Sequence, residues 1–247
     1  MSRWKAAAIH LSISALIGLA SAALIFGVWY PPPYSHASGA DELVLLLLGV
    51  DVVLGPLLTL IVFKAGKKTL RFDLSVIAIL QACAFLYGTS VVIRARPAFI
   101  VGTIDRFVLV SANDLDAEDL SEGKKPEFRS ISWTGPLLVG IEMPGGAVEQ
   151  RDLMFNGAAG KDVEKFPKYY VDYASAAPEM LRRAHSLDEL RKKRPEATSL
   201  IDSWLAGNKK TAADVVWLPL TAPHADLTML LDPHNGSVLD ALRIDPW

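Results

Sequence analysis

The sequence contains a single cysteine, Cys83, and none of the common catalytic or nucleotide-binding motifs. One cysteine excludes a disulfide framework and a cysteine-ligated zinc site. There is no phosphate-binding glycine loop, no nucleophile elbow and no His-Glu-x-x-His helix, and the five histidines are not spaced as metal ligands. Acidic residues cluster only in polar segments, where no apolar pocket would raise a pKa. We therefore expect no enzyme, no catalytic residues, no metal and no cofactor.

Charge is scarce as well, and it is unevenly distributed. The formal net charge is −2, with 25 Lys and Arg against 27 Asp and Glu, so the chain offers no basic surface to the phosphates of nucleic acid. No charged residue occurs between Ala6 and Ala40. The mean hydropathy of +0.28 is high for a soluble domain, and the apolar excess lies in the first 93 residues. These features exclude a disordered protein, a nucleic-acid-binding protein and a cytoplasmic globular enzyme.

Three apolar segments are each long enough for a transmembrane helix, which needs about 20 residues. We expect these helices over residues 9–30, 43–63 and 74–93. The second carries one charge, Asp51, and the other two carry none. Trp29, Tyr30 and Tyr34 at the end of the first are typical of the aromatic belt at a membrane surface. No later segment has this length and composition, so a three-helix transmembrane region, residues 1–93, precedes a domain of residues 94–247.

The basic residues near these segments fall on one side of the predicted membrane. They are Arg3, Lys5, Lys64, Lys67, Lys68 and Arg71. The loop between the first two segments, residues 31–42, has no basic residue. Short basic loops stay in the cytoplasm, so we expect a bacterial inner-membrane protein with a cytoplasmic N-terminus and a periplasmic C-terminal domain. Arg94 and Arg96, at the start of that domain, depart from this pattern.

A cleaved signal peptide is the alternative interpretation of the first segment. Ser38-Gly39-Ala40 would meet the requirement for small residues at a cleavage site. The apolar run is, however, much longer than the apolar core of a signal peptide, which has about 7–15 residues. Pro31-Pro32-Pro33 also separates that run from the cleavage site. We therefore favour an uncleaved membrane anchor.

Residues 94–247 combine strands and short helices. Residues 99–111 are rich in β-branched and aromatic side chains and indicate one or two strands. Pro178 begins one predicted short helix, and Ser186 begins another with a capping-box sequence. Pro233-His234-Asn235-Gly236 lies between two apolar runs and favours a hairpin. Strands followed by helices and further strands predict an α+β fold for this periplasmic domain.

Polar and small residues form a stripe along the second apolar segment. Asp51, Gly55 and Thr59 recur at a spacing of four and therefore share one helix face. Pro56 has no backbone N–H and leaves a helical carbonyl without its partner, so we expect a kink beside Asp51. Small residues at this spacing allow helices to approach closely. Packing of the three helices against one another is therefore one interpretation of the stripe.

Asp51 itself has two interpretations. A carboxylate near mid-membrane costs about 2.5–3.5 kcal/mol and therefore needs a polar partner in the protein. Gln81 and Tyr87 in the third segment lie at a similar depth and would form a hydrogen-bonded cluster with it. Alternatively, Asp51 presents a polar group to a transmembrane helix of another protein. The residues alone leave both interpretations open.

The second segment, Gly49–Phe63, resembles the second helix of the TfpX/TfpZ family of type IV pilin accessory proteins. The similarity extends to Arg71-Phe72-Asp73-Leu74, Gln81, Tyr87-Gly88, Arg96-Pro97, Asp105-Arg106-Phe107, Leu230-Leu231-Asp232 and Asp245-Pro246-Trp247. It follows the order of the whole chain and is dense over residues 49–107 and over the last twenty residues. Residues 112–210 carry no recognised similarity.

The resemblance implies an inner-membrane accessory protein, a chaperone or assembly modulator for the major type IV pilin, that supports pilus assembly without catalysis. Its partners would be the membrane helix and the periplasmic head of that pilin, besides the lipid bilayer, and no nucleic acid. We hypothesise that the Asp51 face holds the pilin helix, that the domain recognises the head, and that residues 94–97 act as a hinge. The candidate partner-binding residues are Asp51, Gly55, Pro56, Thr59, Gln81, Tyr87 and Arg96.

Two other classes of function remain as alternatives. A membrane-anchored periplasmic sensor or ligand-binding subunit would bind a small molecule in the C-terminal domain. A cytoplasmic output domain would support the sensor interpretation, and residues 1–247 contain no such domain. A membrane enzyme acting on lipid or envelope substrates would need titratable residues gathered at the membrane surface. Its candidates are Asp73, Arg94, Arg96 and Asp105.

Overall fold

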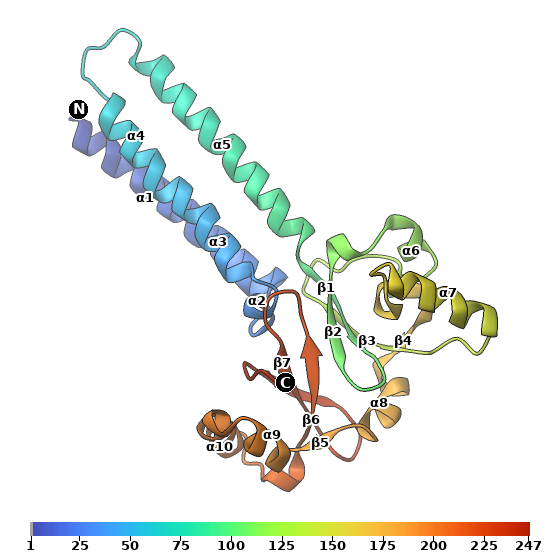
Figure 1. The fold of residues 1–247 in the computed structure, drawn as a ribbon. Helices are drawn as coiled ribbons and strands as arrows, with labels where there is room; N and C mark the ends of the chain where they lie inside the picture. Colours follow the sequence, from blue (N-terminus) through green and yellow to red (C-terminus); the bar gives the residue numbers. More distant parts are fainter. Residues whose placement is uncertain (1) are drawn as a thin grey trace.

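The computed structural model describes residues 2–247. In this part of the chain three helices are long and apolar enough to cross a membrane, and they lead into a mixed α/β domain at one end of the bundle (Figure 1). This arrangement confirms the fold class predicted from the sequence. The first helix consists of α1 (Arg3–Leu24) and a π-helical turn (Ile25–Trp29). The second consists of α3 (Ala40–Gly49), a π-helical turn (Val50–Leu54) and α4 (Gly55–Val62), and the third is α5 (Leu70–Arg94).

Small residues bring the spanning helices together. α1 packs along α4, and α5 packs against α3 and α4. Ser14 and Gly18 are buried on α1, while Gly55 and Thr59 are buried on α4. Small side chains at a spacing of four let helix backbones approach closely in a membrane. Large apolar side chains cover the outward faces of all three helices, as expected for helices surrounded by lipid.

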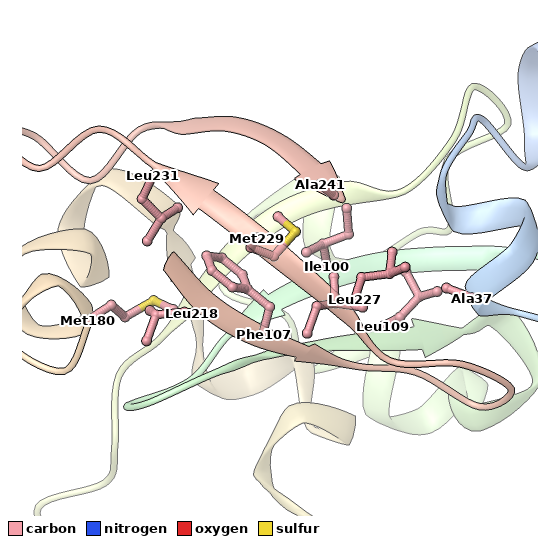
Figure 2. Packing of buried hydrophobic residues seen from close by; sticks show 11 residues of the cluster. Ala37, Ile100, Phe107, Leu109, Met180, Leu218, Leu227, Met229, Leu231 and Ala241 are labelled. Atoms are coloured by element: carbon pink, nitrogen blue, oxygen red, sulfur yellow. The ribbon is translucent and has the colours of Figure 1, made fainter. Parts of the chain in front are cut away.

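The connection between the first two spanning helices packs into the domain. It contains α2 (Tyr34–Ala37), whose Ala37 is fully buried in the main core of the domain with Tyr34 packed against the same core (Figure 2). The backbone N–H of His224 donates to the carbonyl oxygen of Ala37 at 2.9 Å. The prediction that Tyr34 belongs to an aromatic belt is therefore wrong, because its ring packs on protein.

The domain contains one mixed β-sheet. Its strands are β1 (Pro97–Gly102), β2 (Phe107–Ser111), β3 (Leu137–Ile141), β4 (Tyr170–Asp172), β5 (His185–Ser186), β6 (Val216–Thr221), β7 (Leu227–Leu231) and β8 (Val238–Leu242). The strand order is β4-β3-β1-β2-β6-β7-β8, and β5 pairs with β6. β1 and β2 form an antiparallel hairpin at the centre, and each has a parallel neighbour on its other side. The central hairpin thus follows directly from the last membrane helix.

Short helices flank the sheet. They are α6 (Ala117–Ser121), α7 (Ala147–Ala158), α8 (Tyr173–Leu181), α9 (Leu187–Lys193) and α10 (Thr198–Gly207). α8 packs against β1, β3 and β4. α9 and α10 form a second core with β6 to β8, in which Leu190 and Ile201 meet Trp217. No residue of α7 is buried, and this helix lies far from the membrane bundle (Figure 1).

Local signals in the sequence located several of these elements. The Ser186 hydroxyl caps α9 by accepting a hydrogen bond from the backbone N–H of Glu189 at 3.4 Å. The predicted hairpin is formed by β7 and β8, and Gly236 in its turn adopts a φ of +73°. The helix predicted to begin at Pro178 begins instead at Tyr173. Pro178 therefore lies inside α8, where a short helix packed on a sheet tolerates the missing N–H.

Candidate functional site

A cleft runs between α1 and α5 inside the membrane bundle. α1 contributes Ile13 and Ile17, and α5 contributes Ala78 and Ala82, so its walls are apolar. Its volume is about 290 Å³. All four wall residues are exposed, so the cleft is open to whatever surrounds the bundle in the membrane. Such walls suit an apolar chain or the side of a helix better than a polar solute.

The floor of the cleft is polar. Asp51 in the π-helical turn and Gln81 on α5 line it, together with His10 and Ser14 of α1. Gln81 Nε2 donates a hydrogen bond to the backbone carbonyl of Asp51 at 3.2 Å. Asp51 Oδ1 and Gln81 Oε1 are buried and have no hydrogen-bond partner within residues 2–247. Unpaired polar atoms cost free energy in a membrane interior, so a group that donates to them would bind favourably.

Local chain geometry explains why Asp51 and Gln81 meet. Pro56 lacks the N–H that would bond to the carbonyl of Val52, and the π-helical turn contains Val52 and ends two residues before Pro56. The distortion predicted beside Asp51 therefore takes the form of a π turn. Gly55 lies against Gln81, whose amide would overlap with any Cβ at that position. A glycine here lets Gln81 cross α4 and reach Asp51.

The small residues predicted for partner binding lie inside the bundle. Gly55, Pro56 and Thr59 are buried where α4 faces its neighbours. Thr59 Oγ1 lies 2.6 Å from His10 Nδ1, so the two side chains share a hydrogen bond between α4 and α1. This placement favours the packing role of the stripe. His10 was not among the predicted site residues, although it is the one histidine in the predicted first span.

Tyr87 lies apart from the cleft. Its side chain is 73% exposed and borders a second groove of about 380 Å³ between α3 and α5. Among the hydrogen bonds of the described chain, none links Tyr87 to Asp51 or Gln81. The predicted three-residue cluster is therefore wrong in its third member, because α5 turns Tyr87 away from the polar floor. Asp51 borders both grooves, since its π turn lies between α1 and α5.

Arg96 lies at the joint between the bundle and the domain. Only 7% of the residue is exposed, and its Nη1 donates to the carbonyl of Ile93 at 2.7 Å. Nε donates to the carbonyl of Ser132 at 3.4 Å, and the guanidinium lies 4.5 Å from the centre of the Trp133 ring. Burial lowers the pKa of Arg96 below its ordinary value. These contacts make Arg96 a residue of the joint and not of the cleft.

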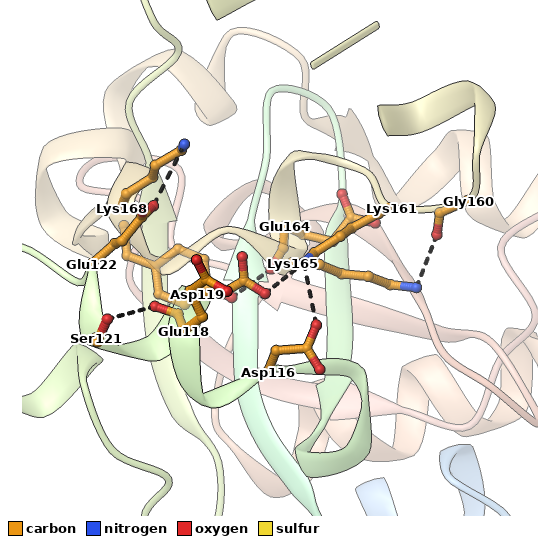
Figure 3. A network of polar contacts seen from close by, with 11 residues as sticks. Asp116, Glu118, Asp119, Ser121, Glu122, Gly160, Lys161, Glu164, Lys165 and Lys168 are labelled. Carbon is orange, nitrogen blue, oxygen red and sulfur yellow. Dashed lines mark hydrogen bonds and ion pairs between the residues drawn. The ribbon is translucent and has the colours of Figure 1, made fainter. Parts of the chain in front are cut away.

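A network of ion pairs lies on one side of the domain. Figure 3 shows Lys161 beside Asp116 and Asp119, and Lys168 beside Glu122. Lys161 Nζ is 2.5 Å from Asp119 and 3.6 Å from Asp116, and the Asp119 carboxylate raises the pKa of Lys161. The network joins α6 to the segment before β4. The exposed Lys168–Glu122 pair is expected to contribute about 0–1 kcal/mol, whereas the Lys161–Asp119 pair is largely shielded from solvent.

The domain also contains a cavity of about 730 Å³ between the β1–β2 turn and α8. Ile104 and Ile141 contribute apolar surface, and Asp105, Glu179 and Arg183 contribute charge. A hydrogen bond from Arg106 holds the pKa of Asp105 below its ordinary value. This mixed lining is the feature on which the sensor alternative would depend. Within residues 2–247 no group of three His, Cys, Asp or Glu side chains is arranged to hold a metal.

Comparisons with known proteins match the N-terminal segment in one case and almost the whole chain in others. The family described as "Fimbrial assembly protein FimB" matches residues 1–39. The fimbrial assembly protein of serogroup I from Dichelobacter nodosus is 31% identical over an alignment of 259 positions, which covers 98% of this chain and 95% of that protein. The serogroup E1 protein of the same organism is 30% identical over 246 residues, with the same coverage of both chains. No solved structure matches.

Proposed function

The chain belongs to the fimbrial assembly protein family, and we propose that it serves pilus assembly as a membrane chaperone or assembly modulator for the major pilin subunit. Two relatives that carry the name fimbrial assembly protein match it over almost its full length. The resemblance to TfpX/TfpZ proteins supports the further proposal that this pilus is of type IV. In this proposal the protein lies in the bacterial inner membrane, holds its domain in the periplasm and acts without catalysis.

The observation that carries the proposal is the α1–α5 cleft with two unpaired acceptors on its floor. A pilin awaiting assembly is expected to have one membrane helix and a periplasmic head. Such a helix would cover the apolar walls and bring a donor to Asp51 Oδ1 or Gln81 Oε1. Ala78 and Ala82 leave room for the approach, because their side chains are small.

The domain would contribute the second contact. α2 is packed into the domain core and Arg96 bonds to both parts, so the domain is held at the end of the bundle. A pilin helix in the cleft would place the pilin head beside this domain. Two weak contacts on one rigid partner raise the overall affinity well above that of either contact, because the second is formed within one complex.

Two alanines on α5 allow a matched test of the cleft. Ala82 lines the α1–α5 cleft, whereas Ala84, two residues further on, lines the groove between α3 and α5. Both are exposed. A photoreactive amino acid is placed at each position in cells that make pilin, and the crosslinked products are identified after illumination. We expect pilin adducts at position 82 and not at position 84. We also expect Ala82→Phe to lower piliation about tenfold, with Ala84→Phe close to the unmodified protein.

The outcomes separate the cleft from the accessory role. Position 82 could yield only lipid adducts while tagged protein still recovers pilin from detergent-solubilised membranes. In that case the proposal that pilin binds in the cleft is wrong, and the accessory role stands. If no pilin is recovered from cells that make it, the chaperone proposal is wrong. The domain cavity would then become the site to test, with small-molecule binding measured on the purified full chain.

A further inference from the structure

Trp133 is an exposed aromatic residue of the domain that lies beside the end of a membrane helix. Its side chain belongs to the loop before β3, and the residue is 61% exposed. We propose that this loop, residues 130–136, rests in the headgroup region of the bilayer that the bundle crosses. The domain would then contact the membrane directly, in addition to its covalent and packed connections with the three helices.

The position of Trp133 follows from its neighbours. Its ring lies 6.4 Å from that of Trp29, centre to centre, and Trp29 is the last residue of the first spanning helix. The Tyr30 hydroxyl donates to the carbonyl of Val92 at 2.6 Å, which places the ends of the first and third helices at one level. A side chain packed beside Trp29 therefore lies where the apolar part of the bundle ends and the headgroup region begins.

The loop is held in this position by contacts on both sides. The Ser132 carbonyl accepts a hydrogen bond from Arg96 Nε, and the Ser132 hydroxyl accepts one from the backbone N–H of Thr134 at 3.1 Å. Gly135 adopts a φ of +98° and lies against Pro31, in the connection that follows the first helix. Only glycine adopts this backbone conformation without strain. The loop thus has a fixed conformation against both helix ends, and Trp133 projects from it.

The chemistry of these side chains fits a phospholipid surface. Indole rings favour the membrane interface, because the ring is apolar and its N–H is polar. The Arg96 guanidinium lies over the Trp133 ring, and Arg94, at the end of α5, is exposed. Arginine side chains pair well with phosphate groups. Exposed indole and guanidinium groups at one level of the molecule therefore match the phosphate and ester groups of lipids.

Helix α7 serves as the control for the Trp133 loop, because it is exposed but lies away from the ends of the bundle. Val148 is also 61% exposed, but it lies on a helix far from the ends of the bundle (Figure 1). Trp133 and Val148 thus have the same exposed fraction, but only Trp133 lies beside the end of the bundle, where the membrane surface is expected. The proposal predicts contact with lipid for the loop and contact with water for α7.

The test uses the full chain in nanodiscs of phosphatidylethanolamine and phosphatidylglycerol. On a Cys83→Ser background, Thr134→Cys or Val148→Cys carries a nitroxide label, and its collisions with oxygen and with a water-soluble nickel chelate are measured. Oxygen concentrates in the bilayer and the chelate in water. We expect the ratio of oxygen to nickel collisions to be several-fold higher at position 134 than at position 148. Equal ratios at the two positions would overturn the proposal.

A second measurement keeps Cys83 and needs no attached label. Lipids brominated near the headgroup quench the fluorescence of tryptophans that touch them. We expect the Trp133→Phe protein to lose a measurable part of this quenching, while the Trp247→Phe protein retains it, because Trp247 belongs to the C-terminal segment of the domain. Unchanged quenching in Trp133→Phe, with a folded protein confirmed by its elution as a single species, would contradict contact with lipid.

Discussion

At the scale of single residues, Gly55 decides whether Gln81 reaches Asp51. A Cβ at this position would overlap the Gln81 amide, whereas a Cβ at Gly49 would meet nothing within 4 Å. We expect Gly55→Ala to displace Gln81 and lose its hydrogen bond, which costs about 1–3 kcal/mol for a buried group. Gly49→Ala should be stabilising by about 0.5–1 kcal/mol, because alanine favours the helix. Thermal unfolding of the two purified variants in the same detergent measures the difference.

The contrasting outcome is equally informative. If Gly55→Ala and Gly49→Ala unfold at the same temperature, Gln81 has another acceptor within reach and its bond to Asp51 does not stabilise the bundle. If Gly55→Ala destabilises and also lowers the crosslinking of pilin at position 82, the polar floor links the packing of the bundle to the binding of its partner. The two measurements use the same variant, so a loss of binding without a loss of stability would assign Gln81 to binding alone.

Tyr173 provides a prediction about pH. Its hydroxyl donates to the carbonyl of Gly236 at 2.6 Å, and burial raises the pKa of Tyr173 to about 12. The pKa of tyrosine in an unfolded chain is about 10. The group therefore contributes its full stability below about pH 10, and this contribution is lost as the pH rises from about 10 to 12, because only the unfolded state ionises there. Denaturant unfolding of the domain, followed by tryptophan fluorescence at pH 8 and pH 11, measures this loss.

Tyr173→Phe is the control for that pH dependence. This variant should be less stable at pH 8 by about 1 kcal/mol, because the hydrogen bond to Gly236 is gone. Between pH 8 and pH 11 it should lose less stability than the unmodified protein, since position 173 no longer ionises. Tyr34, whose pKa burial raises to about 12 as well, would still contribute to the alkaline loss. An identical pH dependence in both proteins would show that Tyr173 does not titrate with unfolding.

At the scale of elements, the four-residue helix α2 connects the membrane bundle to the domain core. Ala37 is 0% exposed inside the domain core, although it belongs to the connection between two membrane helices (Figure 2). We expect Ala37→Leu to overpack that core and destabilise the domain by about 1–3 kcal/mol. Ala8→Leu, at an exposed site on α1, should change its stability by less than about 0.5 kcal/mol. Limited proteolysis in detergent would measure the difference, as faster cleavage within residues 97–247 of the Ala37→Leu protein.

The elements also show what a single sequence can and cannot predict. The spans, the C-terminal hairpin and the capped helix α9 depend on local composition and turn chemistry, and each was predicted at or close to its place. α7 gave no amphipathic pattern because none of its residues is buried. β4 has three residues, which is too short for a period-two pattern. Its pairing with β3 joins residues about thirty positions apart, which no local signal specifies.

The candidate site also contains residues that the sequence predicted correctly and residues that it did not. Asp51 and Gln81 were predicted as a pair because both are polar, both lie in apolar segments and both have a similar depth. The rotation of α5 about its axis is set by packing, and depth alone does not determine it. Tyr87 was therefore predicted beside Asp51 but faces outward. The open α1–α5 cleft depends on which pairs of helices touch, so the walls formed by Ile17 and Ala82 could not be predicted from spacing.

At the scale of the whole molecule, the domain and the basic loop lie at opposite ends of the bundle (Figure 1). The loop at residues 64–69 follows α4, and the domain follows the other end of α5. The domain is held to its end of the bundle by α2 and Arg96, so it crosses the membrane as a unit or not at all. From the positive-inside rule we expect the basic loop in the cytoplasm, and in that orientation the whole domain would lie in the periplasm.

Cysteine accessibility tests this orientation without altering the charges that set it. On a Cys83→Ser background, Ser199→Cys places a thiol on the exposed face of α10 and Ala65→Cys places one in the basic loop. We expect a membrane-impermeant maleimide, added to cells with a permeable outer membrane, to label position 199. Position 65 should react only after the inner membrane is broken. The reverse result would place the domain in the cytoplasm, where it would not meet a periplasmic pilin head, and head recognition would be wrong even if the cleft still bound the pilin helix.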